Sequence, residues 1–307
     1  MDFRQLVTYV QVINLKSFSK ASEKLYMTQP TVTNQIQKLE EELGVTLLNR
    51  NCREITPTEP GISFYSYAAE MINLKEAAIY QLNSYKGKIE GIVEICTSSI
   101  PAQYILPYII KDFKALYPHV CFKIQQTDSK NVCEKIKEGY SNFGVAGFDF
   151  KCKNIECTKL MGDNLVLALP KSYEDRFSHY DNISLEELLT IPIILREEGS
   201  GSRYMVEEEL LKQGISIDQL NISAAVNNNN TIKRLINLNF GGSFMSYLAV
   251  KGDISRGEII PVNIAGMDLK RNFYFVCHKK RFLSPLSNAF KEFVLKSAEN
   301  MDIPSEL

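Results

Sequence analysis

Apolar residues near the start of the chain recur with helical spacing. The set begins with Leu6, Val10 and Ile13 and continues through Ala21, Leu25, Val32, Ile36, Leu39 and Leu43. This spacing predicts two helices, Ser19–Leu25 and Gln29–Leu43, which are separated only by Tyr26–Thr28. Such a short link makes the second helix cross the first at a large angle, as in a helix-turn-helix. An ordinary antiparallel helix pair in a core is the alternative.

The second predicted helix has a polar side rich in hydrogen-bonding groups and poor in charge. Threonine, asparagine and glutamine side chains of this kind can read base edges in a DNA major groove. Residues at the start of the first helix lie close enough to contribute. The candidate DNA contacts are Ser17, Ser19, Gln29, Pro30, Thr31, Thr33, Asn34, Gln35 and Lys38.

A small hairpin is predicted directly after this helix. Gly44 can adopt the left-handed conformation that ends a helix, and Val45–Leu48 and Arg53–Pro57 are short β-prone runs. Arg50 and Arg53 lie beside the predicted tip, where they could contact phosphates. Residues 1–58 therefore read as a winged helix-turn-helix DNA-binding domain.

A long helix is predicted over residues 59–87. Thr58 is a plausible N-cap and Pro60 suits the first turn. An apolar series follows that fits pairing with a second helix: Tyr65, Ala68, Ile72, Ile79 and Leu82. We expect this seam to form a homodimer. Packing of the stripe on its own chain is the alternative.

Strand-like and helix-like runs alternate beyond the glycines at 87 and 91, which predicts an α/β domain with parallel sheets over residues 88–307. Two blocks of alternation predict two lobes, lobe I over about 91–164 and 266–307 and lobe II over about 165–265. Leu165–Leu169 and Ile260–Ile264 are the predicted crossovers between them.

Two turns have the chemistry of a ligand site. One contains Ser98 and Ser99, and the other contains Arg196, Ser200, Gly201 and Ser202; each lies between a predicted strand and the next helix. Free backbone N–H groups at such turns favour anions, and an arginine can hold an oxyanion with two hydrogen bonds. Plain N-capping by serine is the alternative for each turn.

Composition limits the possible functions. The chain has 307 residues, 45% of them hydrophobic, and a formal net charge of -1, which leaves room for a small DNA module joined to a larger sensor. No membrane-length apolar run and no signal peptide is visible, so we expect a cytoplasmic protein that does not contact a membrane. We expect no metal and no cofactor, because the three histidines are scattered and the seven cysteines form no C-x-x-C. A redox role for Cys152 and Cys157 stays open.

The run SFSKASEKLYMTQPTVTNQIQKLEEELGVTLLNR resembles the amino-terminal signature of LysR-type transcriptional regulators, and the similarity extends from Phe3 to Gly61. REEGSGSR, beginning at Arg196, is similar to a run found in many of these regulators. Asn239–Gly242 resembles their G-x-G turn, with Asn239 in place of the first glycine. The resemblance implies a two-lobed sensor like a periplasmic binding protein, a dimerising linker helix and usually a tetramer.

These features together predict a sequence-specific transcription regulator, not an enzyme. It would bind an interrupted inverted repeat in double-stranded promoter DNA and respond to a small anionic effector between the lobes. The alternatives are a solute-binding protein and an α/β enzyme using the same cleft. The amino-terminal module and the missing signal peptide argue against the first. The absence of G-x-S-x-G and phosphate-loop motifs argues against the second.

Overall fold

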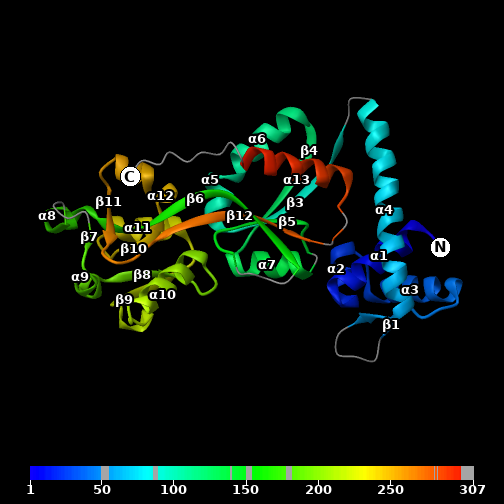
Figure 1. Cartoon of the computed structure of the whole chain (residues 1–307), viewed down its shortest axis with the longest axis horizontal. Helices are drawn as coiled ribbons and strands as arrows, with labels where there is room; N and C mark the ends of the chain where they lie inside the picture. The colour runs from blue at the N-terminus through cyan, green and yellow to red at the C-terminus, as the bar shows by residue number, and fades with distance from the viewer. Residues whose placement is uncertain are drawn as a thin grey trace.

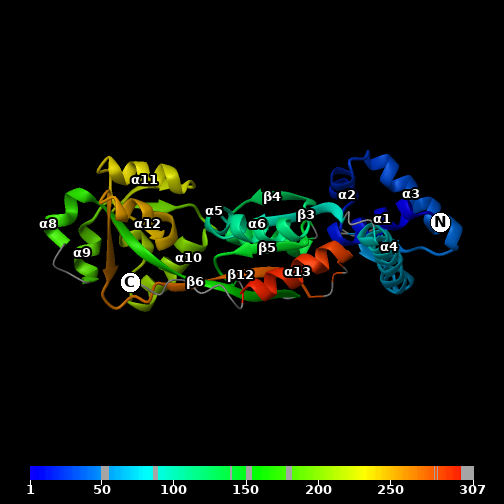
Figure 2. The ribbon, with the colours of Figure 1, turned by 90° about the horizontal axis from the view of Figure 1, so that it is seen from above.

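The computed structural model places an amino-terminal helical module, one long helix and two α/β lobes in a row (Figures 1 and 2). It describes residues 1–49, 55–85, 89–138, 140–149, 154–177, 182–279, 281 and 283–298. Arg50, Arg53 and Cys152 lie outside the described residues. Within the described part of the chain, no helix combines the length and apolarity needed to cross a lipid bilayer.

The amino-terminal module contains three helices and a short hairpin: α1 (Phe3–Leu15), α2 (Phe18–Leu25), α3 (Gln29–Leu43), β1 (Leu48–Asn49) and β2 (Thr56–Pro57). Tyr26 ends α2 in the left-handed region with φ 54°, and Thr28 caps the start of α3, so the two helices turn sharply. Gly44 ends α3 with φ 66°. The winged helix-turn-helix fold is confirmed.

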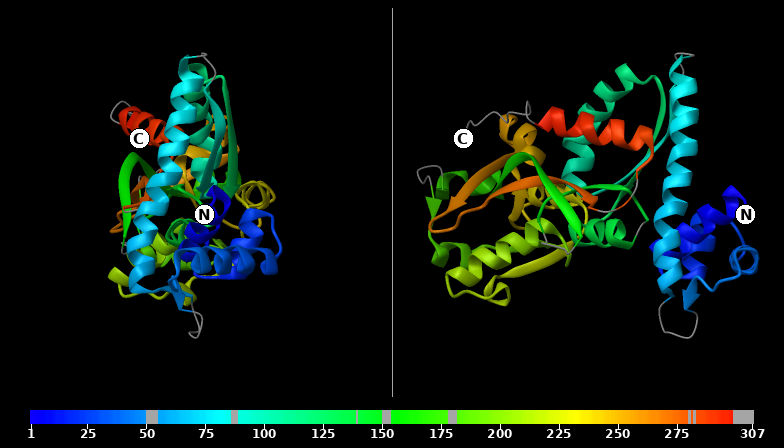
Figure 3. Two further views of the ribbon diagram at one scale, coloured as in Figure 1. Left: turned by 90° about the vertical axis from the view of Figure 1, so that its right-hand side faces the viewer. Right: turned by 45° about the vertical axis from the view of Figure 1, so that its right-hand side comes forward.

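Helix α4 (Glu59–Tyr85) runs alongside this module (Figure 3), and α2 contacts lobe I directly through Lys20–Glu138 and Lys24–Glu94. The predicted dimer seam needs correction. Ala68 is fully buried in the core of the DNA module, and Tyr65 and Ile72 pack against that same core. The Tyr65 hydroxyl also donates to Asn14 Oδ1 at 2.7 Å. Packing on the chain's own α1 therefore occupies this half of the stripe.

Apolar side chains of α4 are left open at two places. Ile79 and Leu82, which continue the predicted seam beyond the part that packs on the DNA module, are 48% and 62% exposed. Tyr67 and Leu74, which the prediction omitted, lie seven residues apart on another side of the helix and are 61% and 73% exposed.

The strands of the lobes are β3 (Glu90–Thr97), β4 (His119–Gln126), β5 (Phe143–Ala146), β6 (Ile155–Pro170), β7 (Asn182–Ile183), β8 (Ile193–Arg196), β9 (Ile222–Val226), β10 (Ser243–Ser246), β11 (Ile259–Ile264) and β12 (Lys270–His278). The main sheet has the order β4-β3-β5-β12-β6-β11-β7, with β10 also paired to β6, and β8 pairs with β9. The α/β fold class is confirmed. The sheets are mixed and not wholly parallel, because β12 runs antiparallel to both β5 and β6.

Helices α5 (Ser99–Tyr104), α6 (Leu106–Leu116), α7 (Ser129–Glu138) and α13 (Pro285–Ala298) belong to lobe I. Lobe II carries α8 (Glu174–Phe177), α9 (Leu185–Thr190), α10 (Gly201–Lys212), α11 (Asn229–Asn237) and α12 (Tyr247–Ser255), with 3-10 turns at Lys171–Tyr173 and Ile217–Gln219. Aromatic rings fill the core of lobe I, where Phe113 and Phe290 have centroids 5.1 Å apart. Leucine and isoleucine dominate the core of lobe II.

The two lobes share long strands. β6 runs without a break through both lobes, and its pairing passes from β12 to β11 along its length. The first predicted crossover, Leu165–Leu169, lies within β6. The second does not lie at Ile260–Ile264, which is paired within lobe II; the chain crosses after Gly266. Asn239 adopts φ 60°, the glycine-like conformation that its place in the turn requires.

Candidate functional site

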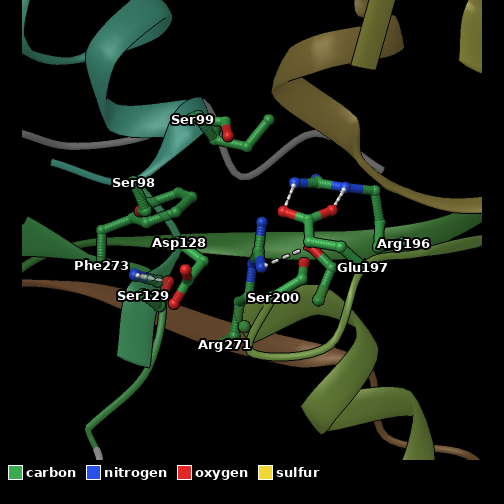
Figure 4. A pocket seen from close by; sticks show the side chains of 13 residues that line it. Ser98, Ser99, Asp128, Ser129, Arg196, Glu197, Ser200, Arg271 and Phe273 are labelled. Carbon is green, nitrogen blue, oxygen red and sulfur yellow. Dashed lines mark hydrogen bonds and ion pairs between the residues drawn. The ribbon is translucent and has the colours of Figure 1, made fainter. Parts of the chain in front are cut away.

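A small pocket lies where the two lobes meet (Figure 4). It encloses about 20 Å³, enough for roughly one water-sized group. All six residues predicted to bind an effector line it: Ser98, Ser99, Arg196, Ser200, Gly201 and Ser202. The fold thus brings the two predicted turns together from opposite lobes. Their role as effector ligands stays a prediction.

The serine hydroxyls in the pocket are not helix caps. Ser98 and Ser200 occupy the N-cap positions of α5 and α10, yet neither side chain makes a capping hydrogen bond. The Ser202 hydroxyl accepts from Arg271 Nη1 at 2.9 Å. The capping alternative therefore does not explain the serines at 98 and 200.

Arg196 is already engaged. Its Nε and Nη2 donate to the two carboxylate oxygens of Glu197, each at 2.8 Å, and Nη1 donates to Asn229 Oδ1 at 2.8 Å. Figure 4 shows this paired geometry directly. The sequence predicts that Arg196 offers two free N–H donors to an anion. This needs correction, because Glu197 already accepts from both Nε and Nη2.

Sequence reasoning missed a second arginine. Arg271 on β12 donates through Nε to Asp163 Oδ2 at 2.8 Å, and both residues are buried. Nη2 lies 2.7 Å from the same oxygen but is not aligned to donate to it, so this buried donor has no hydrogen-bond acceptor among the described residues. Ser246 also donates to Asp163 Oδ1 at 2.9 Å. The only signal in the sequence was a pair of charges inside strands.

The pocket is close to balanced in charge. Two arginines, Arg196 and Arg271, face three carboxylates, Asp128, Asp163 and Glu197, on or beside the lining. Asp128 Oδ1 accepts from the backbone N–H of Asn131 at 2.8 Å, at the start of α7. An entering anion would therefore have to compete with a carboxylate already present.

The turn of lobe II touches lobe I closely. A Cβ at Gly201 would lie 3.0 Å from Ser129 Oγ and 3.4 Å from the carbonyl of Gly147, and one at Gly199, where φ is 83°, would lie 3.0 Å from Asp128 Oδ1. A larger residue at either position would make the facing atoms of lobe I shift by a few tenths of an ångström, and at Gly199 it would also strain the backbone. The described arrangement is thus one in which the lobes are closed.

Substituting Gly201 with alanine is expected to lower the free energy of unfolding by about 1–3 kcal/mol, because the added methyl group overpacks the contact between the lobes. Gly252→Ala is the control: its Cβ would meet only the mobile end of Arg256 at 3.4 Å, and it should stabilise α12 by about 0.5–1 kcal/mol. Urea unfolding measures both. Equal stability of Gly201→Ala and wild type would show that the closed contact does not persist in solution.

The predicted DNA-contacting residues divide into two groups. Pro30, Thr31, Asn34 and Lys38 are exposed along one side of α3, and Gln29 is exposed while accepting from the Ser19 hydroxyl at 3.0 Å. Three others serve the module itself. Ser17 caps α2 through Lys20 N, the Thr33 hydroxyl donates to the Gln29 carbonyl, and Gln35 accepts from Thr8 and approaches Met27 Sδ at 3.8 Å. Gln35 is half-buried and its amide contacts Thr8 and Met27, so its role as a base contact stays a prediction.

Cysteine and metal chemistry find little support in the described structure. No group of histidine, cysteine and carboxylate side chains among the described residues is arranged to hold a metal ion. Burial raises the pKa of the Cys96 and Cys277 thiols, so these side chains stay protonated at neutral pH. Cys157 forms no disulfide with another described residue, and its predicted companion Cys152 lies outside the described residues.

Comparison with known proteins places both parts of the chain. Residues 3–62 match the family model "Bacterial regulatory helix-turn-helix protein, lysR family", and residues 86–299 match "LysR substrate binding domain". An HTH-type transcriptional regulator of Methanocaldococcus jannaschii is 32% identical over 289 residues, covering 94% of this chain and 97% of the relative.

Two solved structures show the same fold. Full-length CbnR complexed with target DNA has 22% identity and a TM-score of 0.56, covering 97% of this chain and 100% of that one. The effector-binding domain of QuiR in complex with shikimate has 18% identity and a TM-score of 0.61, covering 70% of this chain and 100% of that domain. At these identities the likeness concerns the fold alone.

Proposed function

Because the chain belongs to the LysR family of DNA-binding transcription regulators, we propose that a small anionic effector, held between the two lobes, controls its binding to promoter DNA. The amino-terminal winged helix-turn-helix is the DNA-binding part, and the two-lobed domain is the effector-binding part. The relatives whose structures contain target DNA and shikimate support each half of this proposal.

The main support for an anionic effector is the ion pair between Glu197 and Arg196. The Glu197 carboxylate accepts from Nε and Nη2 of Arg196 inside the pocket, in the two-bond geometry that a carboxylate or oxyanion ligand would adopt. Glu197 is also the more exposed partner, at 27% against 7% for Arg196. An entering anion would take its place on Arg196 and release Glu197 to solvent.

The remaining donors suit the same ligand. Arg271 Nη2 is a buried donor without an aligned acceptor, and the hydroxyls of Ser98 and Ser200 are not used as caps. These groups come from both lobes and from the shared strand β12, so a ligand bound to them would favour one lobe arrangement over another. That differential affinity is the requirement for an effector to shift a conformational equilibrium.

Binding to an inverted repeat also requires two copies of the DNA module in one oligomer. We propose a homodimer through the apolar side chains of α4 that remain exposed, Tyr67, Leu74, Ile79 and Leu82, in place of the full seam predicted from the sequence. Two DNA modules related by twofold symmetry would then meet an interrupted inverted repeat. The homotetramer stays a prediction.

A thermal-shift screen of small carboxylates and inorganic oxyanions against the full-length protein tests the effector proposal, because a ligand of the native state raises the melting temperature. Glu197→Gln should bind the best anion about tenfold more tightly, since the substitution removes the competing charge. Glu198→Gln is the matched control. The Glu198 side chain is 92% exposed, so this variant should bind the anion with the same affinity as the wild type.

Two results would contradict this proposal. One is that no anion in the panel raises the melting temperature. The other is that Glu197→Gln and Glu198→Gln bind the anion equally well. For any anion that passes, fluorescence anisotropy with promoter fragments then shows whether it changes DNA affinity.

A further inference from the structure

A second and larger cavity lies at the junction of the DNA module, helix α4 and lobe I. It encloses about 370 Å³ and shares no lining residue with the pocket between the lobes. In Figure 2 the three elements that form this junction, α1, α4 and β3, lie next to one another. The volume falls within the roughly 300–1,000 Å³ typical of small-molecule sites.

One part of the lining is apolar. Val7 and Val10 of α1, Ile72 of α4 and Ile92 of β3 contribute side chains from three different elements. Ile92 is 64% exposed, although it lies on a strand beside the DNA module. A ligand with an apolar body would cover this surface and contact both the DNA module and lobe I.

Several polar groups around the cavity are already used. Arg281 Nη1 donates to the carbonyl oxygens of Ile136 and Ser141, at 2.8 and 3.3 Å, where α7 ends. Glu94 accepts from Lys24 at 2.8 Å and from Lys123 at 3.1 Å. These groups hold the junction together and are not free for a ligand.

Two acceptors in the lining lack a partner among the described residues. Glu76 is exposed to solvent and forms no ion pair with any residue that the structure describes, and the desolvation that it does undergo raises the pKa of its carboxyl group. Gln11 Oε1 is a buried acceptor with no hydrogen-bond partner in the described part of the chain. Of the two glutamates in the lining, Glu94 is paired with Lys24 and Lys123, so Glu76 is the carboxylate that remains for a cationic ligand.

We propose that this cavity binds a small organic cation with a primary ammonium group on an apolar body. The ammonium group donates to the buried Gln11 Oε1, which has no partner among the described residues, and pairs with the Glu76 carboxylate. The apolar body packs against Val7, Val10, Ile72 and Ile92. The bound cation bridges the DNA module and lobe I, so it influences how these parts sit relative to each other, independently of the pocket between the lobes.

The test uses the full-length protein and 4-phenylbutylamine, with 4-phenylbutan-1-ol and 4-phenylbutyrate as uncharged and anionic analogues. Calorimetric titration should show the amine binding at least tenfold more tightly than either analogue. Glu76→Gln should weaken the amine about tenfold, because a hydrogen bond to a charged group is lost. Glu70→Gln, an exposed glutamate of α4 outside the cavity lining, is the matched control and should leave the affinity unchanged.

Gln11→Met provides an independent test, because it should change the stability of the free protein and its affinity for the amine in opposite directions. Removing an unsatisfied buried acceptor should raise the melting temperature of the ligand-free protein by roughly 2 °C while weakening the amine. Ser202→Ala, which alters only the pocket between the lobes, should bind the amine as wild type does. Equal affinity for the amine and the alcohol, an unchanged affinity in Glu76→Gln, or loss of amine binding in Ser202→Ala alone would each overturn the proposal.

Discussion

Replacing Arg271 with alanine is expected to lower the free energy of unfolding by about 3–5 kcal/mol, because Asp163 is left buried without its partner. The Asp163 and Arg271 side chains are 1% and 5% exposed, and their ion pair joins β6 to β12 where these strands connect the lobes. Effector binding should be lost as well, since Arg271 lines the pocket, its Nη1 holds the Ser202 hydroxyl and its Nη2 has no aligned acceptor among the described residues.

Two further variants separate charge burial from packing. Asp163→Leu combined with Arg271→Met replaces the pair with apolar groups and should recover most of the lost stability, because neither charge is then buried alone. Arg256→Ala removes ion pairs of a side chain that is 57% exposed, so it should cost no more than about 1 kcal/mol.

Urea unfolding followed by circular dichroism measures the Arg271 series. If Arg271→Ala cost no more than Arg256→Ala, Asp163 and Arg271 would not form a buried pair in solution. If the apolar double variant remained as unstable as Arg271→Ala, the loss would come from packing and not from the stranded carboxylate.

The Asp163–Arg271 pair also shows where sequence reasoning stops. The helix-turn-helix, the wing and the two serine-rich turns were predictable because each depends on residues close together in the chain. Asp163 and Arg271 face each other only because β6 and β12 pair in one particular antiparallel register. A shift of that register by one residue would turn both side chains away.

The error on α4 has a similar origin. Spacing along the helix identified an apolar stripe correctly, but it does not say which neighbour covers that stripe. α1 brings Leu6, Val12 and Leu15 to the same core as Ala68, so the DNA module itself takes this face. Only the packed structure shows that Tyr67 and Leu74 remain exposed for a partner.

Gln35 and Asn34 illustrate the same limit on the recognition helix α3. They are adjacent in the sequence and both polar, yet Asn34 is exposed while Gln35 bonds to Thr8 inside the module. A helix turns by about 100° per residue, so neighbouring side chains point in different directions. The face that meets DNA is set by how α3 packs on α1.

Replacing Asn34 with alanine is therefore expected to reduce the preference for the cognate sequence while sparing the fold. A lost base contact costs about 1–3 kcal/mol, so the affinity for each half-site of the cognate sequence should fall roughly 5- to 150-fold. Binding to random DNA should change little, because phosphate contacts dominate it. Fluorescence anisotropy with cognate and random duplexes at several salt concentrations measures both affinities.

Two variants on the same helix make the outcome specific. Lys38→Ala should weaken cognate and random DNA alike and reduce the salt dependence by about one counterion, since an exposed lysine contributes through phosphates. Gln35→Ala should lower the stability of the DNA module, because its hydrogen bond to Thr8 is internal. An equal loss on both duplexes with Asn34→Ala would place Asn34 among the phosphate contacts. A loss of discrimination with Gln35→Ala at unchanged stability would mean that its side chain turns outward on DNA. If only Asn34→Ala loses discrimination, the exposed face of α3 is the one that reads the bases.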